Sequence, residues 1–165
     1  MKTVQLVPMA EADFQAYRAQ VIPEYADEQV RAGNWTPQEA RARAEQQFRE
    51  LLPKGVATEH HYLFSVLAAE NGAKVGLLWV ALNARGGRRT AFIYDCVVFE
   101  AHRRQGYGQA ALRALEAMAR GWGVQSIGLH VFAHNTGAQA LYQKAGYVVT
   151  DRQMSKRLET GEAKR

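Results

Sequence analysis

One stretch constrains the fold more than any other, the glycine-containing segment "FEAHRRQGYGQAALRALEAMARGWG" from Phe99 to Gly123. An apolar strand pattern over 91–99 leads into it, and a loop over 100–106 joins that strand to a helical pattern that starts near Tyr107. The helix would turn an apolar stripe toward the core, formed by Ala111, Leu115, Met118 and Ala119. The segment therefore predicts a strand, a short loop and a helix in direct succession.

The glycines of this segment lie where the loop meets the helix. The first N–H groups of a helix have no intrahelical acceptor and form its positive end, and Gly106 and Gly108 leave room for a ligand beside them. Arg103 and Arg104 add permanent positive charge. We interpret the loop as a cradle for a phosphate or pyrophosphate. The alternative is that the glycines serve only a tight turn and that the arginines are solvated.

Two phosphate-binding patterns can be compared with this loop. A P-loop is not indicated, because the chain has no Gly-x-x-x-x-Gly-Lys-Ser/Thr sequence. The spacing Gly106-x-Gly108-x-x-Ala111 fits the dinucleotide fingerprint, which also requires an acidic residue about 20 positions further on. The following strand, "QSIGLHVFAHN", contains no acidic residue. A dinucleotide-binding enzyme is therefore a lower-ranked interpretation.

The remaining elements alternate between strand and helix patterns without an internal repeat. Pro23 predicts a break or kink in a helix over 10–30, and a capping box opens a helix over 37–52. Asn71 and Gly72 predict a tight turn between two strands. Further expected elements are a strand in "TVQLVP", a strand in "QSIGLHVF", a short helix in "NTGAQALYQKAG" and a terminal strand or hairpin in "YVVTDRQMSKRL". This order predicts a mixed α/β domain with antiparallel strands first.

Composition narrows the class of protein. A chain of 165 residues with 47% hydrophobic content suits a single domain, 1–165, with one core. No apolar run is long enough for a membrane span and the N-terminus lacks a signal-peptide pattern, so we expect a cytoplasmic protein with no membrane partner. The net charge of +5 favours anionic ligands. The basic residues are spread along the chain and interleaved with acidic ones, which argues against a nucleic-acid partner. The single Cys96 forms no internal disulfide, and no His or Cys spacing predicts a metal site.

Two sequence patterns in the C-terminal half resemble those of a known family. The first is Arg103-Arg104-Gln105-Gly106-Tyr107-Gly108, which matches the acetyl-CoA signature Arg/Gln-x-x-Gly-x-Gly/Ala of the GNAT superfamily of N-acetyltransferases. The second is "HVFAHNTGAQALYQKAGY", where a strand and an Asn precede the helix pattern Leu-Tyr-x-Lys-x-Gly-Tyr/Phe. The two patterns follow one another in the same order as in the family, and the distance between them along the chain is suitable. The resemblance is strong over 62–158 and weaker over 1–60.

The resemblance implies a GNAT fold, in which a mixed, mostly antiparallel sheet is flanked by helices. In that fold the strand ending near Val98 splays from the strand over 126–132, and the pantetheine of acetyl-CoA lies in the gap. Edge amides left free by the splay can bond pantetheine as a strand would, and one of them can polarise the thioester carbonyl. The residues implied in acetyl-CoA binding are Val97, Val98, Arg103, Arg104, Gln105, Gly106, Tyr107, Gly108, Gln109, Asn135 and Tyr142.

The resemblance also implies catalytic roles. A lysine-like amine has a pKa near 10.4, so a base or a water path must take its proton, while the departing thiolate needs an acid. Tyr142 is the expected acid, because its phenol stands in the matching helix pattern. Its alternative role is packing beside Leu141 and Ala145. Asn135 has an alternative role as the N-cap of its helix.

The base is less well indicated. Many relatives carry a Glu on the strand "FIYDCVV", where this chain has Tyr94 and Asp95, and Asp95 is the chemically able group. Strand alternation turns only one of this pair to the substrate side unless a bulge intervenes. Other side chains have stronger structural readings than functional ones: His60, His61, His130, Cys96, Trp35 and Trp79.

The activity implied is acetyl transfer from acetyl-CoA to a primary amine, by direct attack in a ternary complex. The acceptor is a small molecule or a peptide or protein amine, and its pocket is expected near 23–36 and 84–90, which carry no recognisable motif. A homodimer is a candidate assembly. The alternative from another class is a non-catalytic module that binds or senses acyl-CoA.

Overall fold

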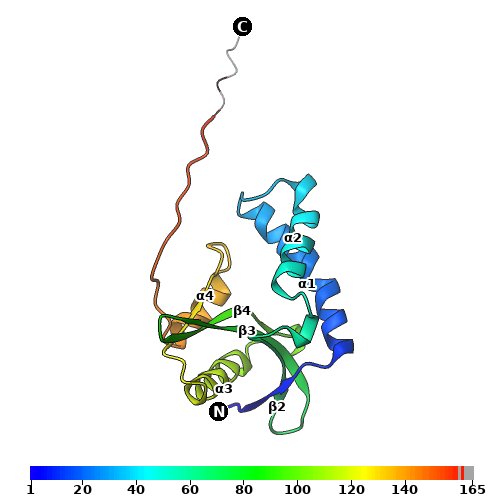
Figure 1. The fold of residues 1–165 in the computed structure, drawn as a ribbon, viewed down its shortest axis with the longest axis vertical. Coiled ribbons are helices and arrows are strands. Elements are labelled where there is room, and N and C mark those ends of the chain that lie inside the picture. The colour runs from blue at the N-terminus through cyan, green and yellow to red at the C-terminus, as the bar shows by residue number, and fades with distance from the viewer. Residues whose placement is uncertain (160, 162–165) are drawn as a thin grey trace.

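A five-stranded sheet in the order β1-β2-β3-β4-β5 forms the centre of the fold, as Figure 1 shows. The structure is a computed structural model that describes residues 1–159 and 161, so part of the expected domain lies outside the described residues. Neighbouring strands run antiparallel except β4 and β5, which are parallel. The strands are β1 (Val4–Pro8), β2 (His61–Ala68), β3 (Lys74–Arg85), β4 (Arg88–Val98) and β5 (Ser126–Leu129). The expected mixed, mostly antiparallel sheet is confirmed.

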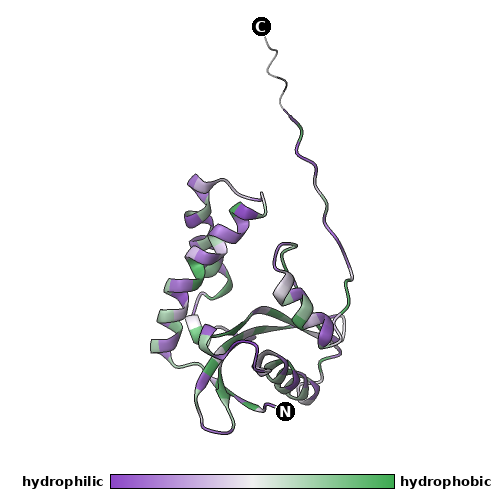
Figure 2. Ribbon diagram, turned by 180° about the vertical axis from the view of Figure 1, so that it is seen from behind, coloured by the Kyte–Doolittle hydropathy of each residue, from purple (hydrophilic) through white to green (hydrophobic). Residues whose placement is uncertain are grey.

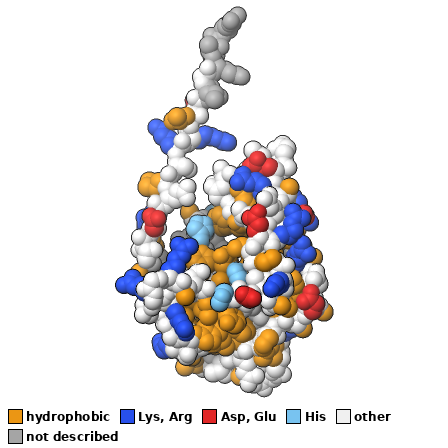
Figure 3. Space-filling view, viewed as in Figure 1, with side chains coloured by type: hydrophobic (Ala, Val, Ile, Leu, Met, Phe, Trp, Pro, Cys, Tyr) orange, Lys and Arg blue, Asp and Glu red, His pale blue; other side chains and the backbone are white. Residues whose placement is uncertain are grey.

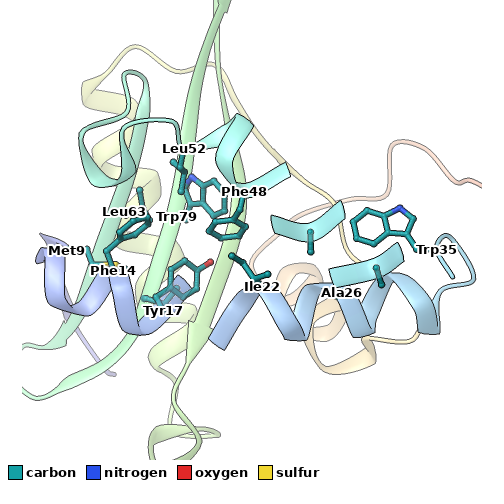
Figure 4. Packing of buried hydrophobic residues seen from close by; sticks show 13 residues of the cluster. Met9, Phe14, Tyr17, Ile22, Ala26, Trp35, Phe48, Leu52, Leu63 and Trp79 are labelled. Atoms are coloured by element: carbon teal, nitrogen blue, oxygen red, sulfur yellow. The ribbon is translucent and has the colours of Figure 1, made fainter. Parts of the chain in front are cut away.

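Two helices from the N-terminal third cover one face of the sheet, α1 (Glu11–Arg31) and α2 (Pro37–Leu51). α2 begins at the predicted capping box, where the Glu39 carboxylate accepts from the Thr36 N–H at 3.2 Å. Figure 4 shows Phe48 beside Trp79 of β3, with Tyr17 next to Phe48, while Phe14 lies beside Leu63 of β2. The outer sides of both helices are hydrophilic in Figure 2. Burial of this apolar cluster therefore holds the helical pair against the strands.

The other face carries α3 (Tyr107–Gly121), with α4 (Thr136–Lys144) beside the open side of β4. The predicted stripe of α3 is confirmed, since Ala111, Leu115 and Ala119 are buried and Met118 is partly buried. They pack on the apolar side chains that β2, β3 and β4 turn to this face, such as Val66, Leu78 and Ile93. The sheet therefore separates two hydrophobic clusters.

Two expected features of secondary structure are wrong. The helix over 10–30 does not break at Pro23, because α1 continues through this position as one helix of 21 residues. Its packing against α2 and the sheet outweighs the loss of a single backbone hydrogen bond. The terminal strand or hairpin over 147–158 is also absent, and this part of the chain runs as an extended tail without a neighbouring strand. A strand pattern needs a partner edge before it forms a strand.

No helix among the described residues is long and apolar enough to cross a membrane.

Candidate active site at the splay of β4 and β5

The central feature of the site is the point where β4 and β5 part. Their parallel pairing covers Thr90–Ile93 opposite Ser126–Leu129 and stops there, while β4 continues alone to Val98 on that side. Among the described residues, the last part of β4 therefore keeps β3 as a neighbour and has no strand on its other side. Such a splay leaves backbone donors and acceptors available to an extended ligand.

The backbone of Val98 faces this opening. Phe99 donates its N–H to Val75 of β3 at 2.9 Å, so alternation turns the backbone groups of Val97 toward β3 and those of Val98 away from it. The Val98 carbonyl is on that outer side, since it accepts from Arg103 Nε at 3.0 Å. Of the two valines in the predicted site, the geometry favours Val98 as the backbone contact.

The loop before α3 presents a run of free backbone donors. Within the described part of the chain, no backbone or side-chain acceptor bonds the N–H groups of 104–109, and the first bonded donor of α3 is Ala110, to the Gly106 carbonyl at 3.1 Å. Two residues of the loop have left-handed backbones, Gly106 at φ 93° and Arg104 at φ 57°. This curvature turns consecutive amides inward and builds an anion-binding concavity at the positive end of α3.

The long side chains of the loop hold its shape. The Arg103 guanidinium bonds the Val98 carbonyl, and Gln105 donates to the Ala101 carbonyl at 3.2 Å. Gln109 donates to the Leu141 carbonyl at 3.2 Å and so ties α3 to α4. Arg104 is exposed and makes no side-chain bond among the described residues. It is the cation of the pair that a ligand can recruit.

Tyr107 is directed away from the opening. Its ring is buried, and its hydroxyl donates to Glu70 at 2.6 Å. Lys2 lies 2.6 Å from the same carboxylate and 4.9 Å from the centre of the Tyr107 ring. Hydrogen bonds from Lys2 and Tyr107 lower the pKa of Glu70 to about 2. Only the backbone of Tyr107 can therefore contact a ligand, and its side chain anchors the start of α3 to the β2–β3 hairpin.

Two glycines serve close packing around the site. A Cβ on Gly108 would lie 3.1 Å from the Leu141 side chain, so this glycine brings α3 against α4. A Cβ on Gly76 would lie 2.1 Å from the Val97 carbonyl oxygen, a distance that no side chain could occupy. Gly76 was missed in the sequence, although an isolated glycine inside an apolar strand indicates a close backbone approach. It keeps β3 close to the part of β4 that borders the opening.

Tyr142 on α4 lies near the exposed length of β4. Burial raises the pKa of its phenol strongly, and its proximity to Cys96 and Asp95 raises that pKa further. The hydroxyl therefore stays protonated at neutral pH and is available as a donor. The ring is also packed, 5.6 Å from the ring of Tyr147, so the packing role and the donor role coexist. Asn135 is the N-cap of α4, where its Oδ1 accepts from the Ala138 N–H at 3.1 Å.

A bulge decides the orientation of Tyr94 and Asp95. β3 pairs Trp79 with Asp95 and Val80 with Ile93, which leaves Tyr94 as an extra residue. Both side chains consequently lie on the α1–α2 face. Tyr94 stacks on Trp79 at 4.6 Å, and Asp95 accepts from the Tyr17 hydroxyl at 2.7 Å. The simple alternation rule for this pair does not apply here.

Asp95 is a buried carboxyl in a mixed environment. Burial raises its pKa, and Glu24 of α1 adds a smaller push in the same direction, while hydrogen bonds from Tyr17 and from the Cys96 backbone lower it. Burial and the Asp95 charge also raise the pKa of Tyr17. Tyr17 and Glu24 were missed in the sequence, because no spacing pattern links α1 to a strand about 75 residues away.

Other candidate residues have structural roles. Burial raises the pKa of the Cys96 thiol to about 12, which leaves it unreactive. Trp35 and Trp79 are buried in the α1–α2 cluster, and Trp79 donates to His61 Nδ1 at 3.0 Å. Burial lowers the pKa of His61, whereas His60 and His130 are exposed. Within the described residues, no group of three or more His, Cys, Asp or Glu side chains is placed to hold a metal ion.

A hollow lies between α4 and the two N-terminal helices. Figure 3 shows hydrophobic side chains and histidines gathered there, on the face where Figure 1 places α4 opposite α1 and α2. His134, in the loop before α4, contacts Glu28 of α1 across this hollow. The splay thus opens beside a recess bordered by α1.

Comparison with known proteins bears directly on this geometry. The model of the acetyltransferase (GNAT) family matches residues 21–147, which include β4, the loop, α3 and α4. The chain belongs to the GNAT family. Its N-acetyltransferase relatives include the uncharacterized N-acetyltransferase YycN of Bacillus subtilis, 41% identical over 94% of this chain and 99% of YycN. A second, YdgE of the same organism, is 36% identical over 93% of this chain and 97% of YdgE.

Solved structures agree with the GNAT assignment. The crystal structure of the Bacillus subtilis acetyltransferase YycN superposes with a TM-score of 0.89, covering 95% of this chain and 99% of that one. An acetyl transferase from Pyrococcus furiosus shares the fold with a TM-score of 0.63 at 24% identity, over 94% of this chain and 99% of that one. The chain is classed as an N-acetyltransferase. The Rossmann interpretation of the glycine loop is not supported, because the sheet formed by the described residues is mostly antiparallel, in the order β1-β2-β3-β4-β5, and not doubly wound.

Proposed function

We propose that this protein transfers the acetyl group of acetyl-CoA to a primary amine by direct attack in a ternary complex. The observation that carries the proposal is the run of free N–H groups over 104–109 directly beside the unpaired edge of β4. An anion site alone would suit many phosphorylated ligands. An anion site continuous with an open strand edge suits a ligand that has both a pyrophosphate and an amide-containing arm.

Acetyl-CoA fits these groups by chemistry. Backbone amides of 104–109 and the Arg104 side chain would hold the pyrophosphate, and the edge at Val98 would pair with the pantetheine arm. Arg103, Gln105 and Gln109 support the loop, and Asn135 caps α4. When bound, acetyl-CoA supplies an acetyl thioester. The Val98 N–H is the donor best placed to stabilise negative charge on a carbonyl oxygen at this edge.

Tyr142 is proposed as the proton donor to the CoA sulfur. The phenol stays protonated across the physiological range, because burial and nearby negative groups raise its pKa. An unperturbed thiol has a pKa near 8.5, well below that of this phenol, so a strong hydrogen bond to the sulfur is favoured over early proton transfer. Such a bond stabilises the leaving thiolate while the C–S bond breaks.

Asp95 is proposed as the group that receives the acceptor's proton. Its raised pKa makes it a better base than an ordinary carboxylate, and Tyr17 holds it in one orientation. Glu24 and Glu28 of α1 lie on the same side of the sheet and add negative charge. This charge favours an amine that arrives protonated and then loses its proton next to Asp95.

The proposal is tested first by ligand binding and then by turnover. Acetyl-CoA at 100 times its dissociation constant should raise the stability of the fold by about 2.7 kcal/mol, whereas NADH should have little effect. CoA release is then measured over a panel of amines, polyamines, aminoglycosides and peptide N-termini. Stabilisation without CoA release from any of these amines would favour the non-catalytic sensor. A larger shift with NADH than with acetyl-CoA would contradict the proposed ligand.

A further inference from the structure

A small cavity lies between α1 and the sheet. It measures about 130 Å³, and its walls come from α1, β2, β3 and the segments next to them. The cavity is on the α1 side of β2 and β3, whereas the opening proposed for acetyl-CoA follows the outer edge of β4. An apolar cavity of about 150 Å³ accepts benzene, so this cavity has room for roughly six non-hydrogen atoms of a ligand.

A hydroxyl without a protein partner lies in the wall of this cavity. Ser65 of β2 is 4% exposed and stands between apolar residues of its strand. Leu63 packs in the α1–α2 cluster, so alternation turns Ser65 to the same side, where it lines the cavity. Its hydroxyl makes no hydrogen bond to another described residue. A ligand that bonds this hydroxyl gains more than at the surface, because folding has already removed the hydroxyl from bulk water.

The mouth of the cavity carries one charge of each sign. Lys74 of β3 bonds Asp13 of α1, and the two side chains are 40% and 38% exposed. An exposed ion pair of this kind contributes little to stability, so its members can separate at little cost. Lys74 is then available to a carboxylate and Asp13 to an ammonium group. A ligand with only one of these charges would leave one member of the pair without a partner.

The rest of the wall is mainly apolar. Its apolar side chains are Met9, Ala16, Leu77 and Phe99. Such a wall favours a short carbon chain and disfavours a charge inside the cavity. The ring of Tyr17 completes the wall, and its hydroxyl bonds Asp95 at 2.7 Å. An occupant of the cavity therefore contacts the ring that orients the proposed base.

We propose that this cavity binds a free α-amino acid with a short hydroxylated side chain, of the class of serine and threonine. The carboxylate and the ammonium group bind Lys74 and Asp13 at the mouth, and the side chain enters the cavity, where its hydroxyl bonds Ser65. The methyl group of threonine lies against the apolar wall. Such a ligand matches the paired charges, the buried hydroxyl and the small volume together. The site does not depend on the proposed acetyl transfer, because binding alone defines it.

Titration of threonine and of valine into the full chain tests the proposal, with the amide signals of Leu77 and Phe99 followed by NMR. The two amino acids have the same shape and differ only in a hydroxyl against a methyl group. Threonine should bind about 10-fold more tightly, as for one hydrogen bond to a buried group. Ser65→Ala should lose this preference. Ser126→Ala, a matched control on an exposed serine of β5, should keep it.

The charges at the mouth are tested separately. Lys74→Gln should weaken threonine binding by about 10-fold, because a charge-assisted hydrogen bond to the carboxylate is lost. Lys54→Gln is the control, since Lys54 is also half of an exposed ion pair, with Glu59, and does not line the cavity. It should bind threonine as the unchanged protein does.

Thermal unfolding of Ser65→Ala separates a binding role of the hydroxyl from a structural one. The melting temperature should stay the same or rise, because the substitution removes a buried hydroxyl that has no protein partner. A marked fall would show that the hydroxyl serves the fold. Signals of Leu77 and Phe99 that do not move up to the solubility limit of threonine would show that the cavity does not take this ligand. Equal affinity for threonine and valine in the unchanged protein would show that Ser65 does not contact the side chain. Each of these three results overturns the proposal.

Discussion

The two sides of β4 border the same opening and are built in different ways. Toward α3 and α4, the groups that would hold a ligand are backbone amides in a curved loop, and glycines and well-packed side chains only give that loop its shape. Toward α1 and α2, the groups proposed to receive the acceptor's proton or to tune it are side chains, Asp95, Tyr17 and Glu24, which reach one place from distant parts of the chain. The loop side is formed by consecutive residues, whereas the α1–α2 side is formed by residues that tertiary packing brings together.

This difference determines which substitutions each side of β4 tolerates. A backbone site depends on dihedral angles, so it is broken by a residue that cannot adopt them and is insensitive to many side-chain changes. A side-chain site depends on the pKa and orientation of a few groups, so it is altered gradually by changes in their hydrogen bonds. Three variants test this comparison in decreasing order of expected effect.

The largest effect is expected for Gly106→Val, on the backbone side. Its φ of 93° is strained for a β-branched residue, so the curve that gathers the amides of 104–109 should be lost. Loss of two charge-assisted hydrogen bonds at roughly 1.5–3 kcal/mol each corresponds to about 10³-fold weaker acetyl-CoA binding, measured by calorimetry. The fold should persist, because a Cβ there would meet only the Lys2 side chain, at 3.7 Å.

Gly121→Val is the matched control, at the other end of α3. A Cβ there meets nothing within 4 Å, and its φ is not in the left-handed range. It should keep full affinity for acetyl-CoA. Equal affinity in both valine variants would mean that Gly106 serves only the turn.

A smaller loss is expected for Tyr142→Phe, which keeps the ring and removes its one proton. Turnover on a good acceptor should fall by about 10²-fold, the lower range for general acid catalysis, with acetyl-CoA affinity nearly unchanged. Tyr62→Phe is the control. Tyr62 is a residue of β2 whose phenol is partly exposed, and its ring stacks on that of Trp122 at 4.8 Å. Full activity in Tyr142→Phe would remove Tyr142 from the mechanism and leave only its packing role.

The smallest effect is expected for Tyr17→Phe, on the side-chain side. The hydrogen bond from Tyr17 lowers the pKa of Asp95, so its removal should raise that pKa. A base acts when deprotonated, so activity is lost as pH falls through its pKa, and the acidic limb of the kcat/KM profile should move to higher pH. At pH 6 the loss should be about 2- to 10-fold, as for one hydrogen bond of about 0.5–1.5 kcal/mol.

Tyr25→Phe supplies the comparison for this profile. Tyr25 is also on α1, and its hydroxyl bonds Gln47 at 3.0 Å and Gln29 at 2.7 Å without reaching Asp95. Its pH profile should match that of the unchanged protein. An acidic limb that stays in place in Tyr17→Phe would contradict Asp95 as the group that controls it.

Several elements were predictable because their signals are local. The loop and α3 follow from two glycines and an apolar stripe within about twenty residues, and the β2–β3 hairpin follows from Asn71 and Gly72. The failures were of another kind. Pro23 was expected to break or kink a helix that the structure shows to be continuous, and the tail was expected to form a strand or hairpin although its sequence pattern does not show which edge it would pair with.

By itself, the sequence determined the family, the order of most elements and the loop whose amides face the opening, because backbone curvature and helix starts depend on residues adjacent in the chain. Tertiary structure alone decided that Tyr94 and Asp95 share a face, since that depends on a bulge in the register between β3 and β4. It also decided that Tyr17 meets Asp95 across 78 positions and that Gly76 lies against Val97. Contacts between distant segments arise only when burial of their apolar faces brings those segments together.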